Sequence, residues 1–356
     1  MTTEATLDEL GSAAEARDEL RSAARGVLER AWSVEELRSR LGGDEPAYDD
    51  TLWRTVRDLG WPDVLVEASH GGGGGSLADL CVLVEELGAA AGPVPLAAAS
   101  AASWCEQRCA EGTPLLLPAN PGALRGDSTV TGTWPMVPYG QVATRLVVLA
   151  AHADGDDHLV ALDVDQPGIE RTPLRPLDHG PAAAITLDRA AIGRMIAHGA
   201  EAQQRWRRAQ DLATLCTAAE LTGVAAAAND AACSYARERV TFDRPIGSYQ
   251  AIKHRLVDQR AAIEVARALT TRAADAWDRQ HPDAAALAAL CAFWAVDALR
   301  AVPEGAVQVF GGIGYTWDHS AHVHLRRAAC LTALLGPRSG YRNTALAWLE
   351  RRHADV

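Results

Sequence analysis

Two segments in the last third of the chain have the residue types and spacing to bind a charged ligand. The first covers residues 237–254 and reads RERVTFDRPIGSYQAIKH, and the second covers residues 308–316 and reads QVFGGIGYT. A guanidinium can pair in a fork with a phosphate, and consecutive glycines let the backbone approach a ligand closely. Taken alone, an arginine at a helix end is usually solvated and a GGxG turn usually just connects two helices. Their meaning therefore depends on the sequence around them.

Three other groups of residues could suggest a function that the sequence does not support. Residues 71–75 are consecutive glycines, but no strand-turn-helix unit with a downstream acid surrounds them. We expect a flexible loop there, followed by a helix that Ser76 caps. His319, His322 and His324 have no matching Cys or carboxylate set, so we expect no metal site. The seven cysteines are scattered, which favours reduced and mostly buried thiols.

The elements that would position the two segments form three parts, helical, then β, then helical. Apolar spacing predicts helices at residues 8–31, 33–40, 50–59, 77–91 and 96–111, and again at 201–237, 249–280, 284–310 and 321–352. Short β-favouring runs predict antiparallel strands at residues 128–131, 145–151, 158–163 and 184–187. We expect a mainly α protein with an N-terminal helical domain (1–112), a middle β domain (113–195) and a C-terminal four-helix-bundle domain (196–356).

Composition and charge exclude several classes of function. The chain has 356 residues, of which 48% are hydrophobic, and its abundant alanine favours helices packed through small side chains. The 34 basic and 46 acidic residues give a net charge of −12 with no Lys/Arg block, so nucleic acid is not an expected partner. Residues 1–21 are acidic and lack a signal peptide's apolar core, and no uninterrupted apolar run could span a bilayer. We expect a cytoplasmic protein with no membrane partner.

Taken together and in this order, the two C-terminal segments closely resemble the acyl-CoA dehydrogenase family. The stretches LW at 52–53, LGW at 59–61 and VEELG at 84–88 fit the same family's first domain. The resemblance covers nearly the whole chain and is weakest in the β part. It implies an N-terminal helical domain, a middle small β-barrel domain and a C-terminal four-helix bundle, assembled as dimers of dimers with FAD at subunit interfaces.

The same resemblance implies the α,β-dehydrogenation of an acyl-CoA thioester. In that reaction the flavin accepts a hydride from the β-carbon while a base removes the α-proton, and the electrons usually pass to an acceptor of the electron-transfer flavoprotein type. Arg239 would pair with the FAD pyrophosphate, Thr241 would donate a hydrogen bond and Phe242 would pack beside the cofactor. In the family these contacts reach the FAD of a neighbouring subunit. The further matched positions are Gln250, Gln308, Gly311 and Gly312.

The base that the family requires is absent from both positions where its members carry it. Most members place a Glu after the GGxGY turn, and the ungapped match puts Leu335 there. A minority carry the base on the preceding long helix, where the match gives Ala213, followed by Thr214 where an Arg is common. Asp211 and Glu220 lie nearby, but we expect neither on the required face, and Glu220 matches a position that packs between helices.

The β part also departs from the family's flavin motifs. Residues 118–122, PANPG, stand in a shortened region where members show a Thr-Glu-Pro…Gly-Ser-Asp stretch, and residues 131–138, TGTWPMVP, replace a Trp-Ile-Thr segment. Pro138 has neither a hydroxyl nor an N–H to offer a flavin. The half of the site that a subunit builds for itself is therefore altered, while the half lent to a neighbour is kept.

Three hypotheses fit this asymmetry. In the first, the chain is the partner subunit of an α2β2 acyl-CoA dehydrogenase and lends its cofactor-binding residues to an FAD whose flavin ring and catalytic Glu belong to another chain. Such enzymes are known in this family from actinobacterial degradation of steroid side chains. In the second, it is a self-sufficient homotetramer whose base has moved, or one that runs a related flavin reaction such as desulfination of an acyl-CoA. In the third, it is a flavin-free scaffold that binds acyl-CoA or a sister chain.

Overall fold

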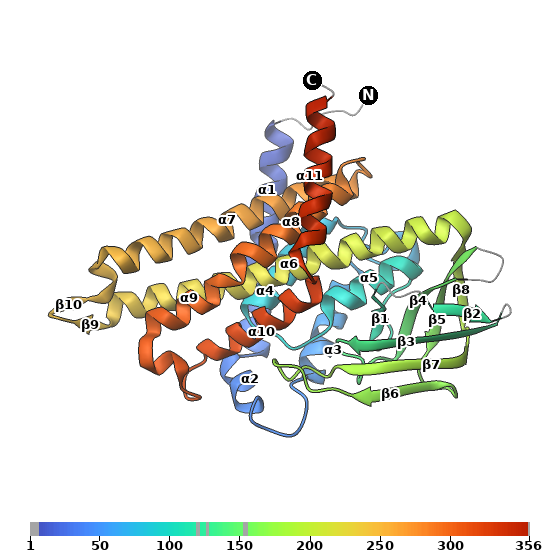
Figure 1. The fold of residues 1–356 in the computed structure, drawn as a ribbon, viewed down its shortest axis with the longest axis horizontal. Helices are drawn as coiled ribbons and strands as arrows, with labels where there is room; N and C mark the ends of the chain where they lie inside the picture. Colours follow the sequence, from blue (N-terminus) through green and yellow to red (C-terminus); the bar gives the residue numbers. More distant parts are fainter. Residues whose placement is uncertain (1–6, 119–121, 126–127, 152–155, 355–356) are drawn as a thin grey trace.

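The computed structural model describes residues 7–118, 122–125, 128–151 and 156–354. Two helical parts pack together along most of the molecule, and the β part occupies one end of it (Figure 1). The first helical part consists of α1 (Leu7–Ala31), α2 (Val34–Arg40), α3 (Asp50–Asp58), α4 (Leu77–Ala89) and α5 (Leu96–Glu106), with 3-10 turns η1 (Trp61–Asp63) and η2 (Ala68–His70) before α4. The predicted order of helical, β and helical parts is confirmed.

The glycine run before α4 is a tightly packed turn, so the expectation of a flexible loop is wrong. The N–H groups of residues 72–75 donate to carbonyls within residues 63–67 at 2.7 to 3.2 Å. A Cβ on Gly72 would overlap the backbone of Val66, so only glycine lets the two segments lie this close. The predicted cap at Ser76 is present, because its hydroxyl accepts from the N–H of Asp79 while the Asp79 carboxylate accepts from the N–H of Ser76.

The β part is an eight-stranded sheet with the order β6-β7-β3-β2-β4-β5-β8, and β1 also pairs with β4. Its strands are β1 (Pro114–Leu116), β2 (Gly122–Arg125), β3 (Thr129–Val137), β4 (Arg145–Ala151), β5 (Asp157–Asp163), β6 (Ile169–Pro173), β7 (Ala183–Ala191) and β8 (Arg194–His198). The expectation of purely antiparallel pairing is wrong in part, since β1 and β2 both run parallel to β4. In both cases the connection to β4 is long enough for the chain to return in the same direction.

Strand β4 connects the sheet to the helices because both of its faces are buried. Leu146 and Val148 lie in the core of the sheet, whereas Val147 and Leu149 belong to the larger helical core. This is the alternation of a strand, in which successive side chains point to opposite faces. The sheet is therefore packed directly on the helices rather than held by a linker.

The second helical part is built on one helix of 40 residues, α6 (Gly199–Glu238). The other elements are a hairpin of β9 (Val240–Thr241) and β10 (Arg244–Pro245), and the helices α7 (Gln250–Asp278), α8 (Ala284–Trp294), α9 (Ala301–Phe310), α10 (Ala321–Leu335) and α11 (Arg338–Ala354). A 3-10 turn, η5 (Gly311–Tyr315), follows α9. Figure 1 shows α6 running through the molecule from the sheet to the hairpin.

Two helices predicted as continuous are interrupted in the structure. The first is broken into α8 and α9 by a π-helical turn, Ala295–Leu299, just before Pro303, which has no N–H to donate to the preceding turn. The second is broken into α10 and α11 at Gly336, whose φ of 81° no helix adopts, and at Pro337. Both interruptions have visible causes in the sequence.

The stretch Ala284–Tyr315 has the length and composition of a membrane-spanning helix, which was not expected from the sequence. Half of its most apolar window is buried inside the protein. It comprises α8, the π turn, α9 and η5. Leu287, Ala292, Leu299 and Val302 lie in the core shared with the other helices. Core helices of this kind meet the same length and composition criteria as membrane spans.

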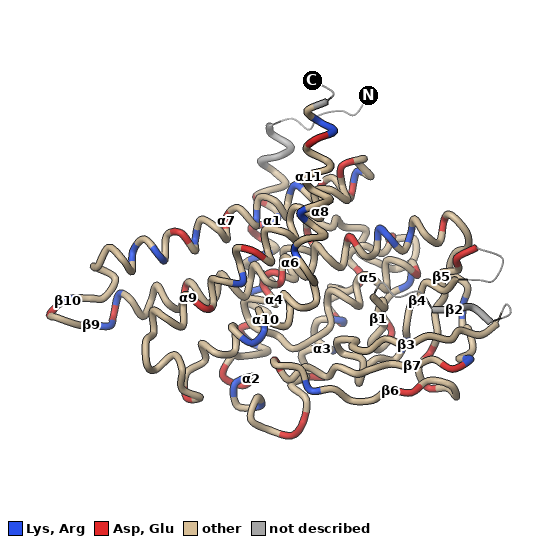
Figure 2. The backbone as a smooth tube through the Cα atoms, in the orientation of Figure 1, with Lys and Arg blue, Asp and Glu red and all other residues tan. Residues whose placement is uncertain are grey.

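Charged residues of both signs are interspersed along the described helices (Figure 2). Several join one element to another. Arg21 and Arg25 of α1 both contact Glu86 of α4, at 3.0 and 2.9 Å, and Arg267 of α7 contacts Glu85 at 2.8 Å. Part of the arginine charge thus fixes the positions of α1 and α7 against α4.

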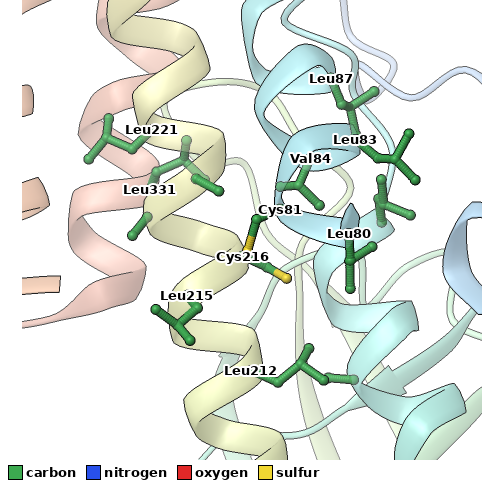
Figure 3. Close-up of a cluster of buried hydrophobic side chains, with 14 of the residues drawn as sticks. Leu80, Cys81, Leu83, Val84, Leu87, Leu212, Leu215, Cys216, Leu221 and Leu331 are labelled. Carbon is green, nitrogen blue, oxygen red and sulfur yellow. The ribbon is translucent and has the colours of Figure 1, made fainter. Parts of the chain in front are cut away.

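The main core lies between α4 and α6. Figure 3 shows Cys81 and Val84 of α4 pointing toward α6, with Cys81 beside Cys216, and Leu331 of α10 near Leu221 on the other side of α6. Two glycines bring the helix backbones together, because a Cβ on Gly223 would overlap the carbonyl oxygen of Glu85 and one on Gly88 would overlap that of Glu220. The crossing therefore depends on the absence of side chains at these two positions.

We expect Gly223→Ala to destabilise the protein by about 1–3 kcal/mol, since the added methyl group forces α4 and α6 apart in a packed core. The gain in helix propensity, roughly 1 kcal/mol, works in the opposite direction. Chemical denaturation measures the difference. Gly340→Ala is the matched control, because nothing lies within 4 Å of a Cβ at that helical position. Equal stability of the two variants would contradict the close crossing.

Candidate functional site

A cavity of about 290 Å³ lies where the sheet, α5, α6 and the end of α10 meet. Leu335 and Ala213, the two positions that the sequence match predicts for the family's base, both line this cavity. They come from α10 and α6, which pack side by side, so tertiary structure brings together positions that are far apart in the sequence. Neither side chain can accept a proton, so neither position supplies a base to this cavity.

Glu220 also lines the cavity, so the expectation that it lies off the required face is wrong. It follows Ala213 by seven residues and Thr217 by three, and this spacing puts all three on one face of α6. Glu220 is nevertheless occupied. Arg327 of α10 donates to its Oε1 through Nε at 2.8 Å and also through Nη2.

Arg327 is the centre of a buried network that sequence reasoning missed. Besides Glu220, it donates to Asp178 Oδ2 at 2.7 Å and to the Tyr139 hydroxyl at 3.1 Å. Asp178 and Tyr139 belong to connections of the β part, so this one side chain joins α6, α10 and the sheet. The four residues are dispersed through the sequence without a local pattern, so no motif could have identified them.

Burial controls protonation in this network. It raises the pKa of Glu220, although the charge of Arg327 opposes that rise. Burial also works to lower the pKa of Arg327, but the charges of Glu220 and Asp178 outweigh it and hold the guanidinium protonated. Burial is the main cause of the raised pKa of Glu220, and the negative charge of Asp178, which shares the same guanidinium, adds to it.

Asp211, the other acid near Ala213, does not line the cavity. Burial raises its pKa to about 6, and the charge of Arg208 limits the rise. Its side chain is half-buried on a different face of α6 from Ala213. A raised pKa alone does not make a base, because the carboxylate must also reach the proton that it removes.

The described wall of the cavity offers a flavin ring few free side-chain hydrogen-bond donors. A flavin needs hydrogen-bond partners around its ring, and Pro118 and Pro138, which line the cavity, have no N–H to donate. The polar side chains of the wall are already bonded within the chain, for example Gln210 to the Leu117 carbonyl and Tyr341 to the Leu335 carbonyl. Within residues 118–122, which replace a flavin motif, residues 119–121 lie outside the described part of the chain.

The residues matched to cofactor binding lie at the other end of α6. Arg239 follows the helix, Thr241 is in β9, and Phe242 forms the tip of the β9–β10 hairpin. Phe242 and Asp243 have φ values of 53° and 63°, the geometry of a two-residue hairpin turn that favours Asn and Gly. Phe242 is 85% exposed. A bulky aromatic side chain held in this turn and turned to solvent is unusual, and such outliers often mark functional sites.

The hairpin is held in place by contacts to the start of α7. The Tyr249 hydroxyl donates to the Thr241 carbonyl at 3.1 Å, and the guanidinium of Arg244 lies over the Tyr249 ring at 3.9 Å. Arg239 is exposed, and within the described part of the chain its side chain has no ion pair or hydrogen bond. A rigid hairpin therefore presents an unpaired guanidinium to solvent, which suits an external phosphate.

The remaining matched positions border a groove next to the hairpin. Gln308 lines an open groove of about 830 Å³ between α7 and α9. Gln250 is exposed and precedes Ala251, which also lines this groove. A Cβ at Gly311 or Gly312 would meet no atom within 4 Å. Gly311 needs its positive φ of 66°, but nothing in the chain's own packing requires glycine at 312. The backbone there is open to another molecule.

The cavity and the hairpin are too far apart to serve one cofactor in one chain. Along α6, the 25 residues from Ala213 to Glu238 span roughly 40 Å at 1.5 Å per residue. An extended FAD molecule is shorter than that. A ligand held by Arg239 therefore has its other end in a different protein molecule, or in a different site.

The three histidines considered for metal binding pack against aromatic rings or the core. His319 lies 4.3 Å from the Phe310 ring centre, His322 lies 4.8 Å from that of Trp317, and His324 is buried. Among the residues that the structure describes, no three His, Cys, Asp or Glu side chains are placed to share a metal ion. The seven cysteines are free thiols.

Matches to the models of two domain families identify the class of protein. The model of the acyl-CoA dehydrogenase N-terminal domain matches residues 14–113, and that of the C-terminal domain matches residues 206–349. The chain belongs to the acyl-CoA dehydrogenase family. Butyryl-CoA dehydrogenase from Megasphaera elsdenii has the same fold, with a TM-score of 0.81 at 20% identity over 98% of this chain and all of that one.

Among individual proteins, the chain is similar to two mycobacterial acyl-CoA dehydrogenases. It is 34% identical to FadE34 of Mycobacterium tuberculosis over 90% of this chain but only 45% of that protein. It is 32% identical to IpdE2 of Mycolicibacterium smegmatis over 91% of this chain and 95% of that protein. The chain thus spans less than half the length of FadE34 and nearly all of IpdE2.

Two similar solved structures contain more than one named component. One is a variant of the Tcur3481-Tcur3483 steroid ACAD, with a TM-score of 0.85 and 27% identity over 96% of this chain and 99% of that one. The other is the ChsE4-ChsE5 complex from Mycobacterium tuberculosis, with a TM-score of 0.82 and 25% identity over 96% of this chain and 98% of that one.

Proposed function

We propose that this chain is the subunit of a heteromeric acyl-CoA dehydrogenase that helps to bind FAD without carrying the catalytic base. Two observations together support this most directly. Apolar side chains, Leu335 and Ala213, occupy both positions predicted for the base, and they line one cavity. Arg239 is exposed and unpaired and lies roughly 40 Å away along α6. Arg239, Thr241 and Phe242 would contact an FAD whose ring lies in a sister chain. Further contacts would come from Gln250, Gln308, Gly311 and Gly312.

The division of labour follows from the chemistry. When bound, FAD supplies the acceptor for the hydride that leaves the acyl β-carbon. This chain would hold the pyrophosphate of the cofactor and shield it from water, while the sister chain supplies the Glu that removes the α-proton. The heteromer is supported by the two similar structures that contain two named components, and the steroid ACAD among them supports an acyl-CoA with a bulky ring system as the substrate.

The test is to purify the full chain alone and together with its sister chain, and to record flavin absorbance per chain and the reduction of an artificial electron acceptor. We expect a colourless, inactive chain alone and about one flavin per two chains in an active complex, because each site is shared by unlike subunits. A yellow and active chain alone would refute the proposal. Absence of flavin from both samples would instead indicate a scaffold.

One alternative also has a specific observation in its favour. In it, the chain is a self-sufficient enzyme and Glu220 is its relocated base. It lines the cavity, and burial raises its pKa, as expected of a base tuned to near-neutral pH. Its engagement by Arg327 argues against this role, because that carboxylate would have to leave two donors to reach a substrate. If the chain alone is active, Glu220→Gln should abolish turnover while keeping the flavin.

We expect Arg239→Ala to weaken FAD binding by the assembled complex roughly thirtyfold, the equivalent of a charge-assisted contact of about 2 kcal/mol. Recovery of flavin fluorescence on dilution measures the dissociation constant. Arg260→Ala is the matched control, since Arg260 is also exposed but pairs with Asp230 and Glu264 within the chain. Equal FAD affinity in the two variants would remove Arg239 from the site.

A further inference from the structure

The loop of residues 313–317, which begins in η5 and leads toward α10, exposes three large apolar side chains that no cofactor contact accounts for. Ile313, Tyr315 and Trp317 are 48%, 74% and 56% exposed. We propose that this docking loop binds directly to the sister chain, whether or not FAD is present. The inference rests on the proposed function, which supplies the sister chain, and deepens it by naming a surface that holds the two chains together.

The docking loop lies at the same end of the molecule as the cofactor hairpin, away from the sheet (Figure 1). Phe310, the last residue of α9, joins the two regions, because its ring packs against that of Tyr235 of α6 at a centroid distance of 5.2 Å. Tyr235 lies one turn before the hairpin, where Val240 and Phe242 are also exposed. Exposed apolar side chains thus gather at this end, and such gatherings mark interaction surfaces.

The backbone of the docking loop is fixed by the chain itself. Arg38 of α2 donates to the Trp317 carbonyl at 3.0 Å, and the guanidinium of Arg326 lies 4.8 Å from the centre of the Trp317 ring. The Thr316 hydroxyl donates to the Ile313 carbonyl at 2.8 Å. An aromatic side chain that is already held in place loses little conformational entropy on binding, which favours its use as an anchor.

The area on offer is that of the centre of a protein interface. With about 150–250 Å² for a whole aromatic side chain, Phe242, Tyr315 and Trp317 together leave roughly 400 Å² exposed. One partner of a standard interface contributes about 800 Å², and tyrosine and tryptophan are enriched among the residues that dominate binding. Phe242 is expected to pack beside the cofactor, so Tyr315 and Trp317 remain for the partner protein.

The occupant is the sister chain rather than a second copy of this chain. The chain's own cavity lies roughly 40 Å along α6 from Arg239, so a cofactor held by Arg239 has its ring in another molecule that lies against this same end. A second copy would bring its own altered cavity, whose described wall offers a flavin ring few free donors. A chain with an intact flavin site is therefore the better match to this surface.

The test measures the association of the full chain with the sister chain of the proposed complex, each purified separately and stripped of flavin. Isothermal titration gives the dissociation constant, and sedimentation velocity gives the size of the complex. We expect the flavin-free chains to associate, and Tyr315→Ser and Trp317→Ser each to weaken association at least tenfold. Trp317→Tyr, which keeps an aromatic ring, should lose less than Trp317→Ser. The matched control is Leu59→Ser, which removes a 52% exposed leucine from the first helical part and should leave association unchanged.

Three results would overturn the inference. They are undiminished association in both Tyr315→Ser and Trp317→Ser, association only after FAD is added, or loss of self-association in these variants while association with the sister chain is kept. Thermal melting shows whether each variant is folded, and Tyr315→Ser remains informative if Trp317→Ser is not, because Tyr315 is the more exposed. Flavin content tests the proposed function separately, since a complex that forms through this loop but binds no FAD would keep the docking surface and refute the shared cofactor.

Discussion

Replacing Arg327 by alanine is expected to destabilise the protein by about 3–5 kcal/mol, because it leaves two buried carboxylates without their shared cation. The Arg327 side chain is only 11% exposed, and those of Glu220 and Asp178 are 7% and 9% exposed. These low exposures limit the solvation that water can offer the two carboxylates once the guanidinium is removed. Because both carboxylates must then be neutral or remain unpaired, the loss should be smaller at pH 5 than at pH 8, and urea unfolding at the two pH values measures it.

The matched control is Arg54→Ala. The Arg54 Nη2 and Asp50 Oδ2 atoms are 2.6 Å apart, close to the 2.7 Å between Arg327 and Asp178. The side chains of Arg54 and Asp50 are, however, 58% and 63% exposed. Exposed pairs of this type contribute about 0.5 kcal/mol or less. A comparable loss of stability in both variants would show that the Arg327 network contributes little beyond an ordinary surface ion pair.

Residues of the Arg327 network also form part of the cavity wall. Arg327 and Glu220 both line it, while Asp178 and Tyr139 bring the connections of the β part to the same point. A change that releases the sheet from α10 would therefore alter the cavity as well as the stability. The network that joins the sheet to α6 and α10 therefore also contributes residues to the cavity beside Leu335 and Ala213.

The helices could be predicted from sequence because their apolar residues repeat with the helical period over long segments. The expected helix 8–31 is observed as Leu7–Ala31, and the expected helix 201–237 as Gly199–Glu238. The breaks at Ala295–Leu299, just before Pro303, and at Gly336 were not predicted, although proline and glycine signal them, because the apolar pattern continues across both. Periodicity predicts where helices can pack, but not where the backbone must change direction.

The strands were harder to predict. Strand β4, Arg145–Ala151, was predicted with its observed bounds because a run of Val, Leu and Ala is buried on both faces. Strands β1, β2, β6 and β8 were not predicted. β1 has three residues, and β6, Ile169–Pro173, is exposed along most of its length, so it has no alternation to detect. β1 pairs with β4, across two intervening strands, whereas β6 pairs with the next strand, β7.

The candidate site divides in the same way. The resemblance named Arg239, Leu335 and Ala213 because their motifs are local in the sequence, and their roles stay predictions. That Leu335 and Ala213 face one cavity, and that Glu220 lies beside them, depends on the packing of α10 against α6 and on the close crossing at Gly223. These are contacts between segments far apart in the sequence, which no single stretch reveals.

We predict that the free energy of unfolding depends on pH through the buried side chain of His324. It is buried in α10, where burial lowers its pKa to about 4 against a hydrogen bond with the backbone of Ala89, whereas an unfolded chain has the usual value near 6.5. As pH falls below 6.5, the unfolded chain takes up a proton that the folded chain refuses. This contribution to stability is therefore present above pH 6.5 and is lost as pH falls through about 4.

At 1.36 kcal/mol for each pH unit between those two values, the loss reaches about 3 kcal/mol. Other buried groups also titrate in this range. The pKa of Asp211, which burial raises to about 6, favours the folded state on acidification, so the net curve of the protein is shallower. The contribution of His324 is isolated by subtracting the curve of His324→Leu, which retains every other group and whose lost hydrogen bond costs the same at each pH. We expect the free energy of unfolding of the protein, relative to that of His324→Leu, to fall by about 3 kcal/mol from pH 7.5 to 4. Parallel curves would mean that His324 is protonated as readily in the folded chain as in the unfolded one.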